Sequence, residues 1–232
     1  MHVELDSKPS YGMAIVTLDK GETITAESGA MVAMSPGLAV DTSFSGANSG
    51  GVVGFLKAAV IGLLRRFLAG ESLFVNHFKA RQDGQQVMLA PTMVGDVIDL
   101  DMAEQKSLTV QSSSYLASTP EVDVDIVWAG FSMLFGGEGA FFLRCRGASG
   151  RLLVNAYGAI DKVEVSGKYV VDSGHVVAFS GDLEYRAKRV GGWKSTLLSG
   201  EGLVLECTGT GTLWVQTRSL SSFLSWITPV LP

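Results

Sequence analysis

Histidine and cysteine, which supply most transition-metal ligands in proteins, are scarce in this chain of 232 residues. The three histidines, His2, His77 and His175, stand apart, and none has another histidine two residues away, so no H-x-H metal box is present. The sequence also lacks C-x-x-C and H-E-x-x-H. We therefore expect no transition-metal site.

Signatures of nucleotide binding and nucleophilic catalysis are missing as well. The chain has no G-x-x-x-x-G-K-[ST], no G-x-G-x-x-G between a strand and a helix, and no G-x-S-x-G elbow. Asp172, Ser173 and His175 lie close together in the sequence, but neighbouring side chains on a strand alternate in direction and cannot meet as a triad. We expect a turn serine and a half-buried histidine here, no cofactor and no enzymatic activity.

The two cysteines, Cys145 and Cys207, are too few for the disulfide framework of a small secreted domain. They lie in FFLRC and LVLEC, runs that are typical of buried strands with small apolar thiols. The first residues, MHVELDSKPS, have no basic start followed by an apolar stretch, so we expect no signal peptide. These features favour a cytoplasmic location.

An excess of positive charge is also missing. The 18 Lys and Arg residues are outnumbered by 23 Asp and Glu residues, and the net charge is −5. Nucleic-acid binding needs concentrated Lys and Arg to neutralise phosphates. The local basic spots at 65–66 and 186–189 are typical of solvated surface, so we expect no nucleic-acid partner.

Apolar residues and glycine are abundant, with 47% hydrophobic residues and 28 glycines against six prolines. Val, Ile, Phe, Tyr and Thr concentrate in short runs such as 152–154 and 163–165, which is typical of strands. Glycine-bearing segments at 83–84, 147–150 and 209–211 are each placed to turn one strand into the next. The pattern predicts an all-β fold in one domain, as a closed or double-sheet body.

One phrase occurs three times and divides the chain into related units. In ITAESGAMVAM, LTVQSSSYLAS and VVDSGHVVAF, a serine is followed five residues later by an alanine. The pairs are Ser28/Ala33, Ser112/Ala117 and Ser173/Ala178. Such self-similarity predicts three internal repeats, approximately 1–100, 101–165 and 166–232.

A Gly-Glu pair also recurs before an apolar run, at Glu71, Glu138 and Glu201. In the structural interpretation, the glycine bends the backbone before a hairpin. The carboxylate then accepts backbone N–H bonds or stays hydrated. In the functional alternative, the three carboxylates converge around a pseudo-threefold axis.

The first unit contains an insertion, SGANSGGVVGFLKAAVIGLLRRFLAG, whose 52–68 segment has the period of an amphipathic helix. Phe55, Leu56, Leu63 and Phe67 are its candidate contact residues. The run is shorter than the about 20 apolar residues of a membrane span and carries Lys and Arg, so we expect no span. The helix either covers an open end of the β body or another subunit, or makes peripheral contact with a membrane surface.

The last residues, SLSSFLSWITPVLP, carry more apolar bulk than a free tail, and Phe223 and Trp226 are their candidate contact residues. The β body itself or a partner subunit would cover this surface. Symmetric homo-oligomers are the commonest way to do so. We therefore expect a homo-oligomer, and a trimer is one form that it could take.

An ordered series of motifs resembles a known family. The series is ESGAMVAM at 27–34, GESLF at 70–74, SYLAS at 114–118, GEGAFFL at 137–143, NAYGAI at 155–160, VVDSGHVVAF at 170–179, SGEGLV at 199–204 and VQTR at 215–218. Together these motifs are similar to the bacterial branch of the altered-inheritance-of-mitochondria family, also called the mitochondrial biogenesis family.

The resemblance implies a fold rather than a reaction. It implies a body like that of the tryptophan RNA-binding attenuation protein superfamily, double-stranded β-helix-like or a β-sandwich, here with three related β units and one inserted helix. The family pattern offers no catalytic residues to carry over. An RNA-binding role does not follow, because a shared fold does not transfer function and this chain is acidic.

Three functions therefore remain as hypotheses. The leading one is a non-enzymatic assembly or scaffold protein. The alternative is a small-ligand or lipid-binding β module, with the 52–68 helix as lid or membrane contact. The third is a hydrolase or isomerase that uses Glu138, Glu201 or His175, for which the sequence has no supporting motif.

Overall fold

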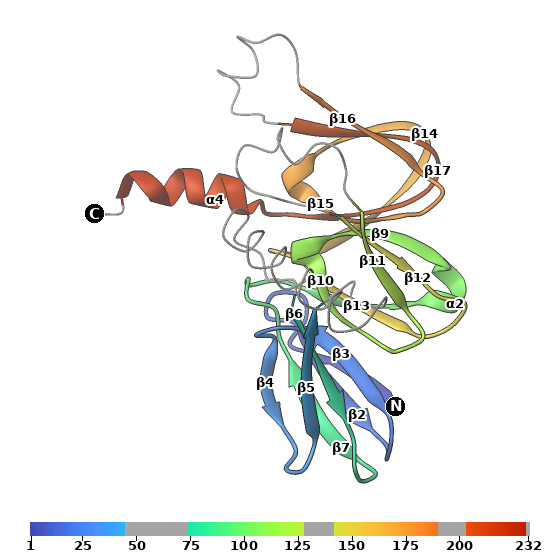
Figure 1. The fold of residues 1–232 in the computed structure, drawn as a ribbon. Coiled ribbons are helices and arrows are strands. Elements are labelled where there is room, and N and C mark those ends of the chain that lie inside the picture. Colours follow the sequence, from blue (N-terminus) through green and yellow to red (C-terminus); the bar gives the residue numbers. More distant parts are fainter. Residues whose placement is uncertain (45–73, 128–141, 190–202, 231–232) are drawn as a thin grey trace, which may run out of the picture.

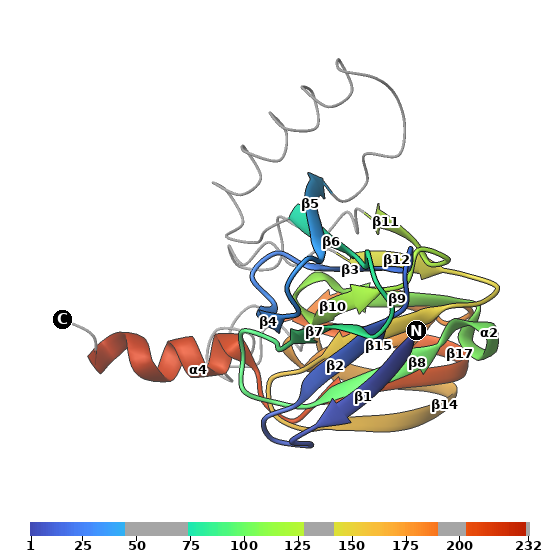
Figure 2. The same cartoon turned by 90° about the horizontal axis from the view of Figure 1, so that it is seen from below.

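The computed structural model describes residues 1–44, 74–127, 142–189 and 203–230. β-Strands predominate in this part of the chain, which confirms the predicted all-β fold class. Figure 1 shows the strands in three stacked tiers, each built from one stretch of sequence, and Figure 2 looks along the stack from its N-terminal end. We call these the N-terminal, middle and C-terminal tiers.

The N-terminal tier contributes a complete sheet and half of a second one. Its strands are β1 (His2–Asp6), β2 (Met13–Leu18), β3 (Thr23–Glu27), β4 (Met31–Met34), β5 (Ala39–Phe44), β6 (Phe74–Lys79) and β7 (Gln85–Leu89). The four-stranded sheet has the order β1-β2-β7-β4. The strands β5-β6-β3 begin a six-stranded sheet that continues into the middle tier.

The middle tier completes that sheet with β10-β13-β8 and begins the next one with β11-β12-β9. Its elements are β8 (Val97–Asp101), α2 (Met102–Gln105), β9 (Ser107–Gln111), the 3-10 helix η1 (Ser112–Ser114), β10 (Tyr115–Ser118), β11 (Asp123–Val127), β12 (Phe142–Arg146) and β13 (Arg151–Asn155). Neighbouring strands in all three sheets pair antiparallel.

The C-terminal tier is built around one long strand pair. Its elements are β14 (Ile160–Asp172), the 3-10 helix η2 (Ser173–His175), β15 (Val176–Ser180), β16 (Glu184–Arg189) and β17 (Leu203–Gln216). The helix α4 (Leu220–Ile227) and the 3-10 helix η3 (Thr228–Val230) follow this tier in the chain. β17 pairs with β14 along the whole of β14 and also receives β15 and β16.

The predicted turn at 209–211 is wrong, because β17 continues through it. Gly209 pairs with Gly167 of β14 and has a φ of 125°, a conformation that favours glycine. Glycines on both strands allow the pair to bend while the ladder continues. The predicted turns at 83–84 and 147–150 are confirmed, since they join β6 to β7 and β12 to β13.

The repeated alanines share a local distortion of the sheet. The register of the strand pairing shifts just before Ala33 in β4, Ala117 in β10 and Ala178 in β15. At such a bulge, one residue of the strand is left without a partner in the ladder. The division into three repeats at the stated boundaries stays a prediction.

Apolar side chains form a core cluster in each tier, and the clusters extend across the joints between tiers. Along β2, every second side chain is fully buried, as expected for a strand with one face on the core. The cluster of the N-terminal tier contains Leu18 and Phe78, and it also takes in Leu116 from β10 of the middle tier. Adjacent tiers therefore share one core at each joint.

Candidate functional site: the C-terminal apolar helix

The candidate residues Phe223 and Trp226 lie on the helix α4. The sequence pattern had not indicated a helix in this segment. The Oγ of Ser219 caps this helix by accepting a hydrogen bond from the backbone N–H of Ser222 at 3.5 Å. The helix ends where Pro229 follows, because proline has no N–H to continue the α-helical ladder. The predicted apolar tail is thus a short, capped helix.

The start of α4 is fixed to the C-terminal tier. The buried side chain of Gln216 accepts a hydrogen bond from the backbone N–H of Tyr157 at 2.8 Å and donates to the carbonyl of Gly174 at 2.8 Å. A Cβ at Gly174 would lie 2.6 Å from Ser219 Oγ, so the turn η2 can approach the helix cap only because this residue is glycine. α4 therefore leaves the β body from a defined point.

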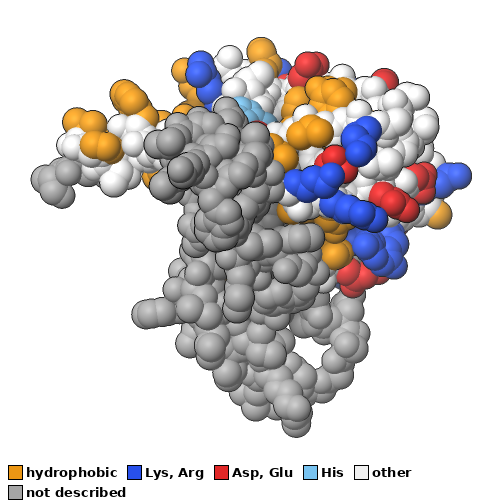
Figure 3. Space-filling model, turned by 90° about the horizontal axis from the view of Figure 1, so that it is seen from above, with side chains coloured by type: hydrophobic (Ala, Val, Ile, Leu, Met, Phe, Trp, Pro, Cys, Tyr) orange, Lys and Arg blue, Asp and Glu red, His pale blue; other side chains and the backbone are white. Residues whose placement is uncertain are grey.

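Beyond that point, Leu220, Leu224 and Trp226 of α4 are exposed to solvent, while Phe223 and Ile227 are half-buried. The half-buried Phe223 ring packs against Tyr157 and Trp226, each with a centroid separation of 6.0 Å. Trp226 is 70% exposed, and Leu224 and Val230 are exposed too. Figure 1 shows α4 projecting from the tiers, and Figure 3 shows hydrophobic side chains along it. Apolar surface on a projecting element is typical of an interaction site.

Asp172, Ser173 and His175 do not form a catalytic triad. The Asp172 carboxylate accepts a hydrogen bond from the backbone N–H of Gly174 at 2.7 Å and so caps η2. His175 Nδ1 donates to the main-chain carbonyl of Gln216 at 2.7 Å. A triad needs the carboxylate to orient the histidine ring. The predicted turn serine and half-buried histidine are confirmed.

His77 is also held by uncharged groups. Its ring nitrogens lie 2.8 Å from Thr25 Oγ1 and 2.7 Å from Ser43 Oγ, so the ring bridges the neighbouring strands β3 and β5. Within the described ranges, no three His, Cys, Asp or Glu residues come close enough to hold a metal ion. The His77 ring therefore links strands of this sheet by hydrogen bonds, which is a structural role.

The two cysteines are free and buried, as the sequence pattern predicts. Burial disfavours the thiolate and raises the pKa of Cys145 to about 12 and that of Cys207 to about 11. The reactive form of a thiol is the thiolate. Neither cysteine is therefore poised to act as a nucleophile at neutral pH.

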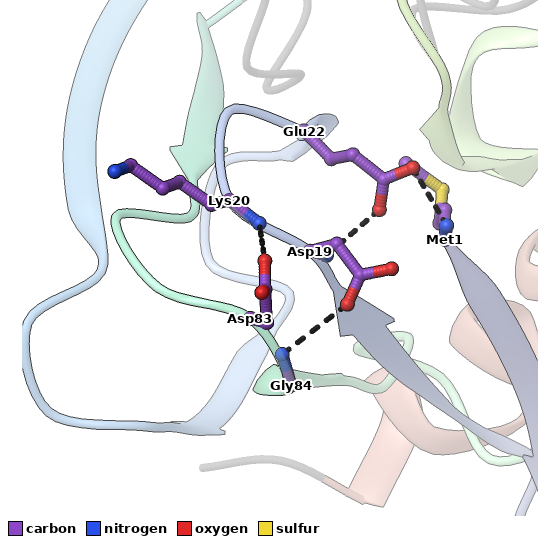
Figure 4. Close-up of polar contacts among 6 residues, drawn as sticks. All are labelled: Met1, Asp19, Lys20, Glu22, Asp83 and Gly84. Atoms are coloured by element: carbon purple, nitrogen blue, oxygen red, sulfur yellow. Dashed lines mark hydrogen bonds and ion pairs between the residues drawn. The ribbon is translucent and has the colours of Figure 1, made fainter.

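A polar cluster at one edge of the N-terminal tier is shown in Figure 4. The Met1 amino group lies 2.7 Å from Glu22 Oε1, while Glu22 Oε2 accepts from the Asp19 N–H at 2.8 Å. The bond from Met1, followed by that from Asp19, lowers the pKa of the Glu22 carboxyl. Asp83 accepts from the Lys20 N–H at 2.8 Å. These carboxylates hold two turns together, which is a structural role.

Several predicted residues lie outside the described residues. They are Phe55, Leu56, Leu63 and Phe67 of the predicted 52–68 helix and the carboxylates Glu71, Glu138 and Glu201. The helix and the convergence of the carboxylates both stay predictions. In the part of the chain that the structure does describe, no helix is both long and apolar enough to cross a membrane.

Glycines at the joints between tiers were not recognised from the sequence. A Cβ at Gly12 would lie 2.7 Å from the backbone nitrogen of Val97, and one at Gly95 would lie 1.9 Å from the carbonyl oxygen of Ala156. Gly158 is packed as closely against the segment before α4. The available signal was the glycine that stands shortly before β2, β8 and β14, in SYGM, MVGDV and AYGAI.

Relatives of this chain support the fold across its full length. An uncharacterised protein of Streptococcus pyogenes serotype M6 is 28% identical over 234 residues, covering 100% of this chain and 92% of the relative. The crystal structure of a protein from Streptococcus pyogenes is similar with a TM-score of 0.78. It shares 23% sequence identity, and the likeness covers 99% of each chain, which shows a common fold.

Family membership rests on a match that covers most of the chain. Residues 3–218 match the family model described as mitochondrial biogenesis AIM24. The matched range contains all three tiers and ends just before α4. It also contains the motifs that suggested this family from the sequence. The chain belongs to the mitochondrial biogenesis AIM24 family.

Proposed function

We propose that this protein is a non-enzymatic scaffold that associates with further copies of itself, and that α4 packs against a neighbouring copy. The observation that carries this proposal is the exposed apolar side of α4, with Trp226 70% exposed on a helix that has no buried residue. Burying such a surface is favourable because apolar area leaves water.

A second copy is the partner we propose because apolar side chains are exposed at both ends of the stack. Met31 and Val32 are exposed in the N-terminal tier, and Tyr169 and Val170 are exposed in the C-terminal tier. A chain with apolar surface at both ends covers both when it stacks on itself. Most soluble oligomers are indeed homo-oligomers.

The state of the two thiols and the hydrogen bonding of His175 support a non-enzymatic role. The two thiols are buried with raised pKa values, and His175 is bonded to the main chain. The lipid-binding alternative depends on the 52–68 segment, which lies outside the described residues, and no described feature favours it.

Truncation after Arg218 tests the role of α4. The variant keeps every residue of the family match and all three tiers, so it is expected to fold. Its self-association constant should weaken about tenfold, the result of losing about 1.4 kcal/mol of interaction. Light scattering at a series of concentrations measures this change.

A matched pair of point variants separates lost apolar contact from altered chain length. Trp226→Ala should weaken association in the same direction, whereas Ser225→Ala, at an exposed polar position on the same helix, should leave it unchanged. If truncated and full-length chains associate equally and stay equally soluble, α4 is not part of the interface.

A cytoplasmic location is the second element of the proposal. Its support is that Cys145 and Cys207 are free thiols, as is usual in a reducing compartment. Fractionation of host cells should recover the protein with a cytoplasmic marker enzyme. Recovery with a secreted or membrane marker would overturn this assignment.

A further inference from the structure

The two joints between tiers are made by the same strand pairing. At the first joint, β10 pairs antiparallel with β3, and Ala117 lies opposite Ala26. At the second joint, β15 pairs antiparallel with β9, and Ala178 lies opposite Val110. In both cases the residues that follow the bulge in β10 or β15 pair with the edge strand of the preceding tier. The two joints therefore share one pattern of strand pairing.

Each joint also inserts a bulge residue into the core of the preceding tier. Leu116 of β10 is 0% exposed and belongs to the cluster of the N-terminal tier. Val177 of β15 is 0% exposed and belongs to the cluster of the middle tier, which contains Leu108 and Val110. The pairing thus brings both main-chain hydrogen bonds and apolar burial.

β4 is the corresponding strand of the N-terminal tier, and among the described strands it pairs with β7 alone. It has the same bulge before Ala33, and it pairs with β7 as β10 pairs with β13 and β15 with β17. All four of its residues are exposed, whereas those of β10 are all buried. Val32, which corresponds to Leu116 and Val177, is 57% exposed. In the described part of the chain, β4 thus has the bulge of the joint strands β10 and β15 but no edge strand of a preceding tier to pair with.

At the other end of the stack, the edge that corresponds to β3 and β9 has no strand like β10 or β15 paired with it among the described strands. β3 and β9 end just before the serines of the repeated phrase, and the C-terminal half of β14 has the same place before Ser173. Among the described strands, only β17 pairs with this half of β14. Tyr169 is 41% exposed and Val170 is 53% exposed. Among the described strands, residues 168–172 therefore have an open outer edge, in which the charged Lys168 and Asp172 flank an apolar centre at Tyr169, Val170 and Val171.

We propose that β4 of one copy pairs antiparallel with residues 168–172 of β14 in the next copy, which continues the stack from chain to chain. The inference rests on the proposed self-association and names its surface. At each internal joint, the repeated alanine lies opposite the residue that stands two positions before the repeated serine of the preceding tier. The same register between two copies places Ala33 opposite Val171 and Met34 opposite Val170.

The partner is a second copy because β4 and β14 lie at opposite ends of the stack. Figure 1 shows the middle tier between them. Unpaired strand edges readily recruit further strands, and an apolar edge does so more strongly than a charged one. The contact joins two different surfaces, so it is heterologous, and it closes into a ring if the rotation between copies allows.

Two single variants, used apart and together, test this interface. Val32→Lys should block the β4 edge and Val170→Lys the β14 edge, because each replaces a valine that the proposed contact would bury with a charged side chain. Each purified variant should associate at least about 100-fold more weakly than wild type, as for a residue at the centre of an interface. Sedimentation velocity of full-length proteins measures the masses.

Mixing the two variants gives the decisive result. Each variant keeps one intact edge, and the two intact edges are complementary, so the mixture should form a one-to-one dimer that cannot grow. Val94→Lys, at a residue 55% exposed in the segment before β8, should associate like wild type and is the matched control. Circular dichroism and thermal unfolding verify that all three variants are folded.

The outcomes distinguish the proposals. If wild type associates and both variants associate equally well, the strand interface is wrong while self-association stands. If both variants are monomers and the mixture gives no dimer, the contact is not head-to-tail and the inference is overturned. If wild type is itself a monomer at every concentration, self-association and the strand interface both fail.

Discussion

Replacing Gly95 with alanine is expected to lower the free energy of unfolding by at least about 3 kcal/mol, the upper end of the usual cost of forcing an atom into a packed site. The new Cβ would lie 1.9 Å from the carbonyl oxygen of Ala156 and 2.6 Å from that of Gly158. Both obstacles are backbone atoms, which cannot rotate away as a side chain can. Urea unfolding followed by circular dichroism measures the loss.

The cost arises because this contact joins the segment before β8 to the segment before β14. The carbonyl of Gly158 accepts a hydrogen bond from the Asp96 N–H at 2.8 Å, and the N–H of Gly158 donates to Val94 at 3.0 Å. Separating the segments to admit a methyl group breaks these main-chain hydrogen bonds. The loss therefore adds to the steric cost.

Gly21→Ala is the comparison in which the added methyl group meets no neighbour. Gly21 has a φ of 90° and nothing within 4 Å of an added Cβ, so its substitution should cost only about 1–2 kcal/mol of left-handed strain. Gly95 has no positive φ, so its loss measures crowding, and a loss smaller than that of Gly21→Ala would contradict the prediction.

Phe179→Ala should be the most destabilising substitution among the described core residues, with a loss of about 3–5 kcal/mol. Phe179 lies on β15 and is 0% exposed. Its ring centroid is 4.8 Å from that of Tyr185 and 5.7 Å from that of Phe142, both in edge-to-face contacts. Alanine would leave a cavity between these rings, since a packed core relaxes only partly. The midpoint and slope of urea unfolding give the loss.

Phe179→Leu serves as its companion, because leucine fills much of the space but forms no ring contacts. It should be clearly more stable than the alanine variant and less stable than wild type. If alanine costs less than about 1 kcal/mol, the value for an ordinary surface change, this aromatic cluster does not anchor the C-terminal tier.

Strand content and most turns could be predicted because their signals are local. Alternating apolar residues mark strands such as β2, and Asp83-Gly84 marks the turn before β7. The glycines at 209–211 misled the prediction because glycine permits a sharp bend as readily as a reversal. Which of the two occurs depends on the opposite strand, where Gly167 bends as well. No local pattern carries that information.

The candidate site was only partly visible in the sequence. The apolar excess of Phe223 and Trp226 pointed to an interaction surface, and both lie on the exposed helix α4. The strand edges at Val32 and Val170 could not be found in this way, since both residues read as ordinary strand positions. Only a comparison with the pairing of β10 with β3 and of β15 with β9 shows that these two edges have no such neighbour among the described strands.

Native mass spectrometry of the wild-type protein over a range of concentrations decides whether the chains associate through their strand edges. We expect a multiple of 24.5 kDa that falls to one chain when Val32→Lys is introduced. A mass of 24.5 kDa for wild type at every concentration would contradict it.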